Sequence, residues 1–328
     1  MRALVCHRLG GPEDLEVREL PDPQPGPGEI AIAVTAAGVN FADSLMIAGK
    51  YQEKPPLPFV PGLEAAGRVV ALGAGVANIG SDVQVLALAD RGAFAERLIV
   101  RASDCILLPD GLDDSTAAGL AIAYGTAEMA LVERARLQAG ETLLVLGAAG
   151  GVGLAAVEVG KALGARVVAV ASSEEKRALA SEHGADVALE DGPETLRERL
   201  KDETGGRGVD VVFDPVGGAL FDAALRATAW SGRLLTVGFA GGSVPQVPAS
   251  YLLVKNIAVI GLYWGSYRRF APARLAQGFA RLFAWHAEGK IRPAIAHRLP
   301  LDKGAEAIKL LTERKALGKV VIEIGAGR

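Results

Sequence analysis

Four glycines lie close together in residues 147–153, near the middle of the chain. The apolar run 142–146 before them predicts a strand, and a helical pattern follows them. Glycine permits a tight turn at such a junction and lets an anion approach the free N–H groups of the helix start. We therefore expect a dinucleotide pyrophosphate at Gly150, Gly151 and Val152; the alternative is a glycine-rich turn that binds nothing.

The next predicted strand, residues 166–171, indicates which dinucleotide binds. It ends on Ala171, where an NAD site usually carries an acid that accepts hydrogen bonds from the ribose 2′-hydroxyl. Ser172, Ser173 and Lys176 follow, and their hydroxyl and ammonium groups suit a 2′-phosphate. We therefore expect NADPH rather than NADH. A helix cap for Ser173 and a solvated surface position for Lys176 are the alternatives.

Apolar strands alternate with helices around this loop, which predicts a parallel sheet covered on both faces. We expect a doubly wound α/β (Rossmann) domain over residues 121–262. Its strands are predicted at 142–146, 166–171, 209–213, 233–237 and 259–262. Ligands of such sheets bind at the carboxyl ends of the strands, which adds Val216, Gly238 and Phe239 to the expected cofactor site.

The first third of the chain is instead rich in short strands separated by turns. They are predicted at 29–35, 68–71, 84–88 and 94–100. A final strand at 319–324 must pair somewhere, and we expect it to return to this first domain. Residues 1–120 and 263–328 would then form one discontinuous, partly open β-barrel domain. We expect the active site in the cleft between the two domains.

The composition disfavours several classes of protein. The chain has 328 residues and a net charge of -3, which suits two domains and provides no basic field to attract nucleic acid. Its two cysteines cannot form a disulfide framework, and no apolar run approaches the roughly 20 residues that span a bilayer. We expect a soluble, cytoplasmic protein with a small-molecule substrate.

Several motifs, taken in order, resemble the zinc-free quinone oxidoreductase branch of the medium-chain dehydrogenase/reductase superfamily. They are AGVNFAD at 37–43, PGLEAAG at 61–67, YGT at 124–126, the glycine loop, SSEEK at 172–176, DPVGG at 214–218 and GKVV at 318–321. The resemblance covers essentially the whole chain. It implies a GroES-like first domain, hydride transfer from NADPH to a quinone or other conjugated carbonyl, and a homodimer, for which residues 254–262 offer an edge strand.

The two positions that hold zinc in the metal-dependent members of that superfamily differ in this chain. A cysteine and a histidine are replaced by Asn40 and Leu63; leucine cannot ligate a metal, and an amide is a poor zinc ligand. We therefore expect no zinc and a structural role for Glu64. Without a Lewis acid, a conjugated carbonyl is the better acceptor, because conjugation spreads the charge of the incoming hydride.

The resemblance also implies roles for individual side chains. Asn40 would donate an amide N–H to the substrate oxygen, Tyr51 would stack on a quinone or donate a proton, and Thr126 would touch the nicotinamide. Asn40, Thr126 and Lys319 are expected cofactor contacts. Asp43 would orient Asn40 or cap a helix. The alternatives for the first three are a turn asparagine, a loop aromatic and a helix residue bonded to its own backbone.

Two features leave other functions open. Relatives with this cofactor motif carry a tyrosine and a basic residue after the third strand, whereas Glu190 and Asp191 stand here, which weakens the preference for NADPH. Arg268 and Arg269 could meet an anionic substrate and make the protein an enoyl or acrylyl reductase, or could be solvated surface residues. A cofactor-binding protein with a structural or regulatory role and no turnover is the alternative of another class.

Overall fold

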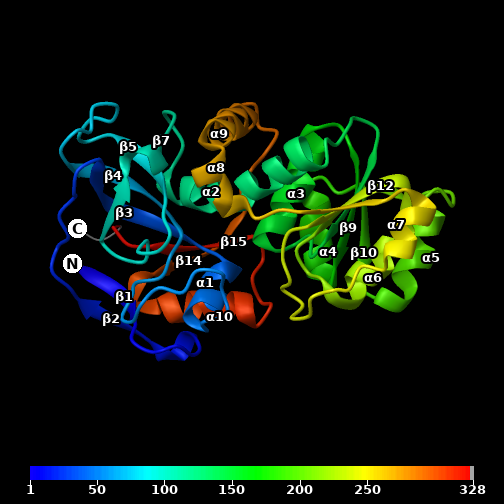
Figure 1. Ribbon diagram of the computed structural model, residues 1–328, viewed down its shortest axis with the longest axis horizontal. Helices are drawn as coiled ribbons and strands as arrows, with labels where there is room; N and C mark the ends of the chain where they lie inside the picture. Colours follow the sequence, from blue (N-terminus) through cyan, green and yellow to red (C-terminus); the bar gives the residue numbers. More distant parts are fainter. Residues whose placement is uncertain (326–328) are drawn as a thin grey trace. The chain divides into compact units, whose positions relative to one another are not determined.

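The computed structural model describes residues 1–325, which fold into two compact units (Figure 1). Unit 1 comprises Met1–Ile122 together with the C-terminal segment from Pro293, and unit 2 comprises Ala123–Arg292. The chain therefore passes between the units twice, after Ile122 and after Arg292. No helix within residues 1–325 combines the length and the apolar character needed to cross a membrane.

Unit 2, in which every residue is described, contains a six-stranded parallel sheet in the order β10-β9-β8-β11-β12-β13. The strands are β8 (Thr142–Leu146), β9 (Arg166–Ala171), β10 (Val187–Glu190), β11 (Val209–Asp214), β12 (Thr228–Thr236) and β13 (Ala258–Gly261). The order runs outward in both directions from β8 and β11, which makes their junction the switch point of the sheet. Ligands bind at the carboxyl ends of strands at such a point.

Helices pack against this sheet and bury its apolar strands. They are α3 (Gly151–Ala162), α4 (Glu174–Glu182), α5 (Pro193–Glu203), α6 (Gly218–Ala227) and α7 (Ala249–Lys255). Unit 2 also contains the end of α2 (Asp114–Glu128), which begins in unit 1, the short α8 (Tyr267–Phe270) and α9 (Pro272–Ala287). Leu144, Val168, Val212 and Phe221 meet in one core cluster. The doubly wound α/β domain expected from the sequence is thus present.

The segment 263–292 differs from the expectation, because it packs with unit 2 rather than with the first domain. Helix α9 buries Phe279 and Leu282, and the Phe279 ring meets the Trp264 ring edge-on at 6.3 Å. Arg281, on the same helix, pairs with the buried carboxylate of Glu128 on α2. These apolar and ionic contacts hold the segment to unit 2, and patterning along the chain does not reveal them.

In unit 1, the described residues form a seven-stranded sheet and a separate hairpin of β1 (Arg2–Cys6) and β2 (Leu15–Glu19). The sheet order is β14-β15-β3-β4-β5-β7, and β6 pairs with β3. Its strands are β3 (Glu29–Val39), β4 (Glu64–Leu72), β5 (Gln84–Leu88), β6 (Arg97–Arg101), β7 (Cys105–Leu107), β14 (Ile295–Pro300) and β15 (Lys319–Glu323). Helices α1 (Phe41–Ile47) and α10 (Gly304–Thr312) accompany it.

The terminal strand returns to the first domain, as expected. Strand β15 pairs antiparallel with β3, with Val320 opposite Val39, and in Figure 1 the red β15 lies beside the blue β3. Strands β3 and β4 extend beyond the predicted 29–35 and 68–71, into small residues where the alternation of apolar and polar side chains fails. This extension carries Val39 and Glu64 to the ends of their strands.

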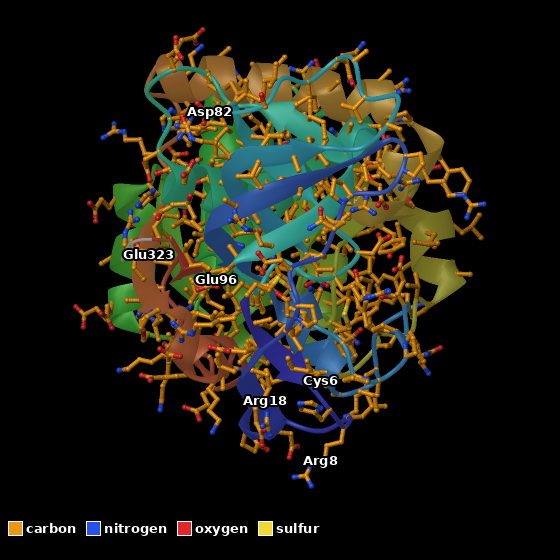
Figure 2. The ribbon with its side chains drawn as sticks, turned by 90° about the vertical axis from the view of Figure 1, so that its left-hand side faces the viewer. Cys6, Arg8, Arg18, Asp82, Glu96 and Glu323 are labelled. Atoms are coloured by element: carbon orange, nitrogen blue, oxygen red, sulfur yellow. The ribbon has the colours of Figure 1, made fainter. Side chains whose placement is uncertain are left out.

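The two cysteines are free thiols on different strands of unit 1. Cys6 is buried in β1, and burial raises the pKa of its thiol. Figure 2 labels Cys6 together with Arg8 and Arg18, whose exposed side chains belong to the same end of the unit. Cys105 begins β7 and is half-buried, and burial raises its pKa to about 12. Neither thiol is poised as a nucleophile.

Candidate active site

The glycine turn after β8 leaves room for an anion above the first turn of α3. Gly147 has φ +61, a conformation that L side chains rarely adopt, and a Cβ at Gly153 would lie 2.2 Å from the Gly147 carbonyl oxygen. A Cβ at Gly150 would meet only that same oxygen, at 3.5 Å. Gly150 is the N-cap of α3, and no side chain caps the helix. Its first N–H groups therefore suit a pyrophosphate.

The loop after β11 lies beside this glycine turn and is fixed by Asp214, the last residue of the strand. The buried carboxylate of Asp214 accepts hydrogen bonds from the backbone N–H of Val216 (2.7 Å) and Gly217 (2.9 Å). Burial raises the pKa of this carboxyl, and those two amides oppose the rise. A Cβ at Gly147 would lie 3.0 Å from Val216, so the loop after β11 adjoins the glycine turn.

Val216 and the two residues expected after β12 come together through backbone hydrogen bonds. The N–H of Ala240 donates to the Pro215 carbonyl at 3.0 Å, and that of Gly241 donates to the Val216 carbonyl at 2.8 Å. On the other side of Gly238 and the partly exposed Phe239, the N–H of Val237 donates to the Asp214 carbonyl at 2.8 Å. Asp214, which organises the loop, was missed as a site residue, although the DPVGG motif contains it.

At the end of β9, the sequence-predicted cofactor residues surround the first turn of α4. Ser173 is the N-cap of α4, and its hydroxyl accepts a hydrogen bond from the Lys176 backbone N–H at 3.3 Å, as the helix-cap alternative predicts. Ser172 is exposed. The guanidinium of half-buried Arg177 lies 3.5 Å from the Ala171 carbonyl oxygen, so a second cation accompanies Lys176 here. Sequence reasoning missed Arg177.

An acidic side chain also lies close to this strand end. Glu190, the last residue of β10, is the register partner of Ala171, the last residue of β9. The neighbouring strand thus places an exposed acidic residue beside the strand end that lacks one. Two cations and one carboxylate therefore share the region that would meet the adenosine ribose.

Thr126 lies on a closely packed part of α2 in unit 2. Its side chain is buried, and the preceding Gly125 packs against Trp264: a Cβ at Gly125 would lie 2.7 Å from the indole ring. The phenol of Tyr124 donates a 2.7 Å hydrogen bond to the carboxylate of Glu158 on α3. The YGT motif is therefore fixed on both sides within unit 2.

In unit 1, Asn40 belongs to a buried cluster that we call the Glu64 cluster, consisting of Asn40, Glu64 and Lys319. The Asn40 amide donates to Glu64 Oε1 at 2.7 Å, and its Oδ1 accepts from Lys319 Nζ at 3.0 Å. Lys319 Nζ also donates to Glu64 Oε1 at 2.8 Å and to the Val39 carbonyl at 3.1 Å. The Glu64 and Lys319 side chains are 0% and 4% exposed.

The chemistry of its neighbours fixes the orientation of the Asn40 amide. Its N–H side faces a carboxylate and its oxygen faces an ammonium; the reverse orientation would oppose like charges at both ends. The second N–H of the amide points to the Gly38 carbonyl at 3.3 Å. Donation to a substrate oxygen, as expected from the sequence, therefore requires one of these two bonds to be exchanged.

Glu64 has the structural role expected from the sequence. Its second oxygen accepts a 2.6 Å hydrogen bond from the backbone N–H of Ile122. Gly38 leaves space for the carboxylate, because a Cβ at that position would lie 2.3 Å from Glu64 Oε1. Lys319, expected from the sequence to contact the cofactor, directs its ammonium to three acceptors inside unit 1.

Asp43 lies beside the Glu64 cluster at the start of α1. Its Oδ2 accepts from the Asn40 backbone N–H at 2.8 Å, so it caps the helix, one of the two roles expected for it. Burial, opposed by that backbone bond and reinforced by the charge of Glu64, raises its pKa to about 7. Its Oδ1 is buried and has no hydrogen-bond partner among the described residues.

The remaining candidates lie on loops and short helices. Tyr51 follows α1 and is half-buried against the core of unit 1. Arg268 and Arg269 belong to α8 in unit 2, where Arg269 lies 5.2 Å from the centre of the Phe270 ring. Unit 2 also has a cavity of about 280 Å³ next to this helix, lined by residues such as Arg134, Tyr267 and Phe270.

Two protein-family descriptions match parts of this chain. The alcohol dehydrogenase GroES-like domain matches residues 26–110, and the zinc-binding dehydrogenase domain matches residues 151–281. The first covers most of the strands of unit 1, and the second begins at Gly151, inside the glycine turn, and covers most of unit 2. Despite the second description, residues 1–325 contain no group of three or more His, Cys, Asp or Glu that could hold a metal ion.

Whole-chain comparisons point to one branch of dehydrogenases. A quinone oxidoreductase-like protein 2 homolog of Nematostella vectensis is 39% identical over 98% of this chain and 88% of its own length. The solved quinone oxidoreductase of Escherichia coli, complexed with NADPH, is 30% identical with a TM-score of 0.92 and covers 98% of this chain and 100% of its own. The quinone oxidoreductase of Thermus thermophilus is 35% identical, with a TM-score of 0.85 and coverages of 98% and 100%.

A GroES-like domain joined to a doubly wound nucleotide domain defines the medium-chain dehydrogenases and reductases. Within that superfamily, this chain belongs to the quinone oxidoreductase branch, and it is an oxidoreductase.

Proposed function

We propose that this protein is a zinc-independent, NADPH-dependent quinone oxidoreductase that transfers hydride to a quinone or another conjugated carbonyl. The observation that carries the proposal is the Glu64 cluster. An amide stands where metal-dependent relatives have a cysteine, and an internal ammonium is bonded to it. That position therefore holds an amide oriented by a buried ammonium–carboxylate pair instead of a metal ligand.

The residues of unit 2 fit NADPH, with which the quinone oxidoreductases of Escherichia coli and Thermus thermophilus were both solved. The N–H groups of Gly151 and Val152 would hold its pyrophosphate, and Gly150, whose own N–H donates to the Gly147 carbonyl at 3.1 Å, would leave room for it. When bound, NADPH supplies the hydride. The glycine turn has space for the pyrophosphate, since no Cβ or helix cap fills it.

The two ends of the dinucleotide would meet different loops of unit 2. Ser172, Ser173, Lys176 and Arg177 would meet the 2′-phosphate, because hydroxyl and cationic groups complement its charge. The nicotinamide end would meet a second set: Thr126, Val216, Gly238 and Phe239. We expect NADPH to bind more tightly than NADH, although Glu190 reduces the difference.

The residues of unit 1 would serve the acceptor. Asn40 would donate an amide N–H to the negative charge that develops on the acceptor oxygen, and Lys319, bonded to Asn40 Oδ1, would polarise and orient that amide. Tyr51 would stack on the acceptor or supply the proton. Thus Lys319 acts through Asn40 rather than on the cofactor, a revision of the role expected from the sequence.

We also propose that two copies of the chain associate through unit 2. Strand β13 is the edge of the sheet, so its outer N–H and C=O groups are available for pairing. Leu253 and Val254, in the helix before it, are 80% and 76% exposed. Light scattering should give twice the chain mass, and substituting Val259 by proline should give a monomer. A wild-type monomer would contradict the proposal.

The decisive experiment for the activity is an NADPH-oxidation assay with benzoquinones, enals and acrylates. We expect quinone turnover to survive dialysis against a chelator, in protein shown to be zinc-free by mass spectrometry of the metal content. Loss of activity that zinc restores would overturn the metal-independent mechanism. Faster turnover of acrylate or its coenzyme A thioester would favour the enoyl reductase alternative, and NADPH binding without any turnover would favour the structural protein.

A further inference from the structure

Glu158 is a buried carboxylate in unit 2 that the proposed chemistry does not use. It lies on α3, and its side chain is 6% exposed. One oxygen accepts hydrogen bonds from the Tyr124 phenol (2.7 Å) and the Arg292 backbone N–H (2.9 Å), and the other meets Nδ1 of His183. It lies seven residues beyond Gly151, about 10 Å along the helix, so it does not touch an anion at the helix start.

These partners come from the elements that would hold the cofactor. Tyr124 lies on α2, two residues before Thr126 at the nicotinamide end. Glu158 itself is on α3, whose first turn faces the pyrophosphate. His183 is the C-cap of α4, and the N-cap of that helix, Ser173, belongs to the 2′-phosphate region. One side chain therefore connects the three helices that contact the three parts of the dinucleotide.

The contacts of Glu158 also fix the chain where it enters and leaves unit 2. Tyr124 is the second residue of the unit and Arg292 is its last. Tyr124 is fully buried, and burial together with the charge of Glu158 raises the pKa of its phenol well above the usual value. The phenol therefore stays protonated and donates the hydrogen bond, and the Glu158 carboxylate accepts it.

We propose that Glu158 is a positioning residue that sets the spacing of α2, α3 and α4 to the length of the bound dinucleotide. A dinucleotide has two covalently joined halves, and it binds tightly only when the binding sites for both halves are correctly spaced. A ligand that contains only one half needs only one of these sites. The inference rests on the proposed NADPH site. It does not depend on quinone turnover, because dinucleotide binding alone can test it.

Two single substitutions separate positioning from a general structural role. Tyr124→Phe cuts the connection to α2 and should weaken NADPH binding about tenfold, while 2′,5′-ADP, which lacks the nicotinamide half, should bind as to wild type. His183→Ala cuts the connection to α4 on the adenosine side and should weaken both ligands. Isothermal titration calorimetry measures both affinities, and circular dichroism verifies that each variant is folded.

Glu158→Gln is the matched control. The glutamine oxygen can accept from Tyr124 and Arg292, and its amide can donate to a neutral His183 imidazole, so NADPH affinity should stay within about threefold of wild type. The inference would be overturned if Tyr124→Phe weakened the binding of NADPH and of 2′,5′-ADP equally. It would also be overturned if NADPH affinity were unchanged in both Tyr124→Phe and His183→Ala. Wild-type protein that binds NADPH but reduces no quinone would overturn the proposed function and leave this inference standing.

Discussion

Each unit of this protein has a buried carboxylate at the centre of a hydrogen-bond cluster, but the two are compensated differently. Glu64 in unit 1 faces the ammonium of Lys319, so its charge is paired. Glu158 in unit 2 faces a phenol, a backbone N–H and an imidazole. Both also accept a backbone N–H from the last residue before the chain passes to the other unit: Ile122 for Glu64 and Arg292 for Glu158.

The difference suggests two uses for a buried carboxylate. Paired with an ammonium, Glu64 makes a local charge distribution that can act on a reacting oxygen, at the cost of two desolvated ions. Surrounded by hydrogen-bond donors, Glu158 connects α2, α3 and α4, and we propose that it sets their spacing. The same chemical change should therefore have unequal consequences at the two sites.

The largest effect is expected from Glu64→Gln, which leaves the Lys319 ammonium buried without its anion. Breaking one partner of a buried ion pair costs about 3–5 kcal/mol, so the free energy of unfolding should fall by that amount. Chemical denaturation at neutral pH measures it. The double variant Glu64→Gln with Lys319→Met removes both charges and should recover part of the loss. If the double variant is less stable than Glu64→Gln, the two charges are not coupled as described.

Asp43 tests the comparison further, because it is a buried carboxyl of unit 1 whose pKa is raised by burial more than the nearby charge of Lys319 lowers it. Its pKa is raised to about 7 in the folded state, so the folded protein binds its proton more tightly than the unfolded chain. The stability from this group is complete below the ordinary aspartate pKa and is lost as pH rises through about 7. A tenfold difference in proton affinity between the folded and unfolded states corresponds to about 1.4 kcal/mol.

Asp43→Asn should remove this pH dependence and keep the helix cap, since an amide oxygen can still accept from the Asn40 N–H. We expect wild type to lose stability relative to the variant between about pH 4 and pH 7, measured by thermal unfolding across that range. Parallel curves for the two proteins would show that Asp43 does not titrate there.

Asn40→Ala tests whether the Glu64 cluster acts in catalysis and not only in folding. The alanine variant keeps the Lys319–Glu64 ion pair but lacks the amide through which Lys319 is proposed to act. We expect kcat for quinone reduction to fall at least about tenfold, equivalent to about 1.4 kcal/mol of transition-state stabilisation. Tyr51→Phe should lower turnover if the phenol supplies the proton. If neither change lowers kcat, unit 1 contributes no catalytic group at these positions.

The sequence predicted strands and helix caps well where the evidence for them lay within the element itself. The apolar runs gave β8, β9 and β5 with their observed bounds, and Ser173 caps α4 as its position before the helix suggests. The terminal strand returned to the first domain as expected, and the structure shows that its partner there is β3. The strand bounds and the helix cap depend on periodicity or on neighbours within a few residues, whereas the strand pairing of Val320 with Val39 is long-range.

Long-range partners were beyond such reasoning. Lys319 and Glu64 are 255 residues apart, and no pattern links a lysine in a terminal strand to a glutamate in an early one. Tyr124, Glu158 and Arg292 likewise meet only because three elements pack together. The helices α5, α6 and α7 were not predicted either. Chemistry could be assigned to single residues from the sequence, but the clusters that orient them required the fold.

The smallest effect on stability is expected at Glu158, the buried carboxylate of unit 2. Glu158→Gln removes a formal charge from a site that holds no cation comparable to Lys319, and it can keep all three hydrogen bonds. An exchange that leaves every buried donor and acceptor paired costs little, so the free energy of unfolding should change by less than about 1 kcal/mol. The measurement is the same denaturation experiment as for Glu64→Gln, with the two variants compared directly. A loss at Glu158 as large as that at Glu64 would mean that the anion itself is required in unit 2, and the contrast between the two clusters would fail.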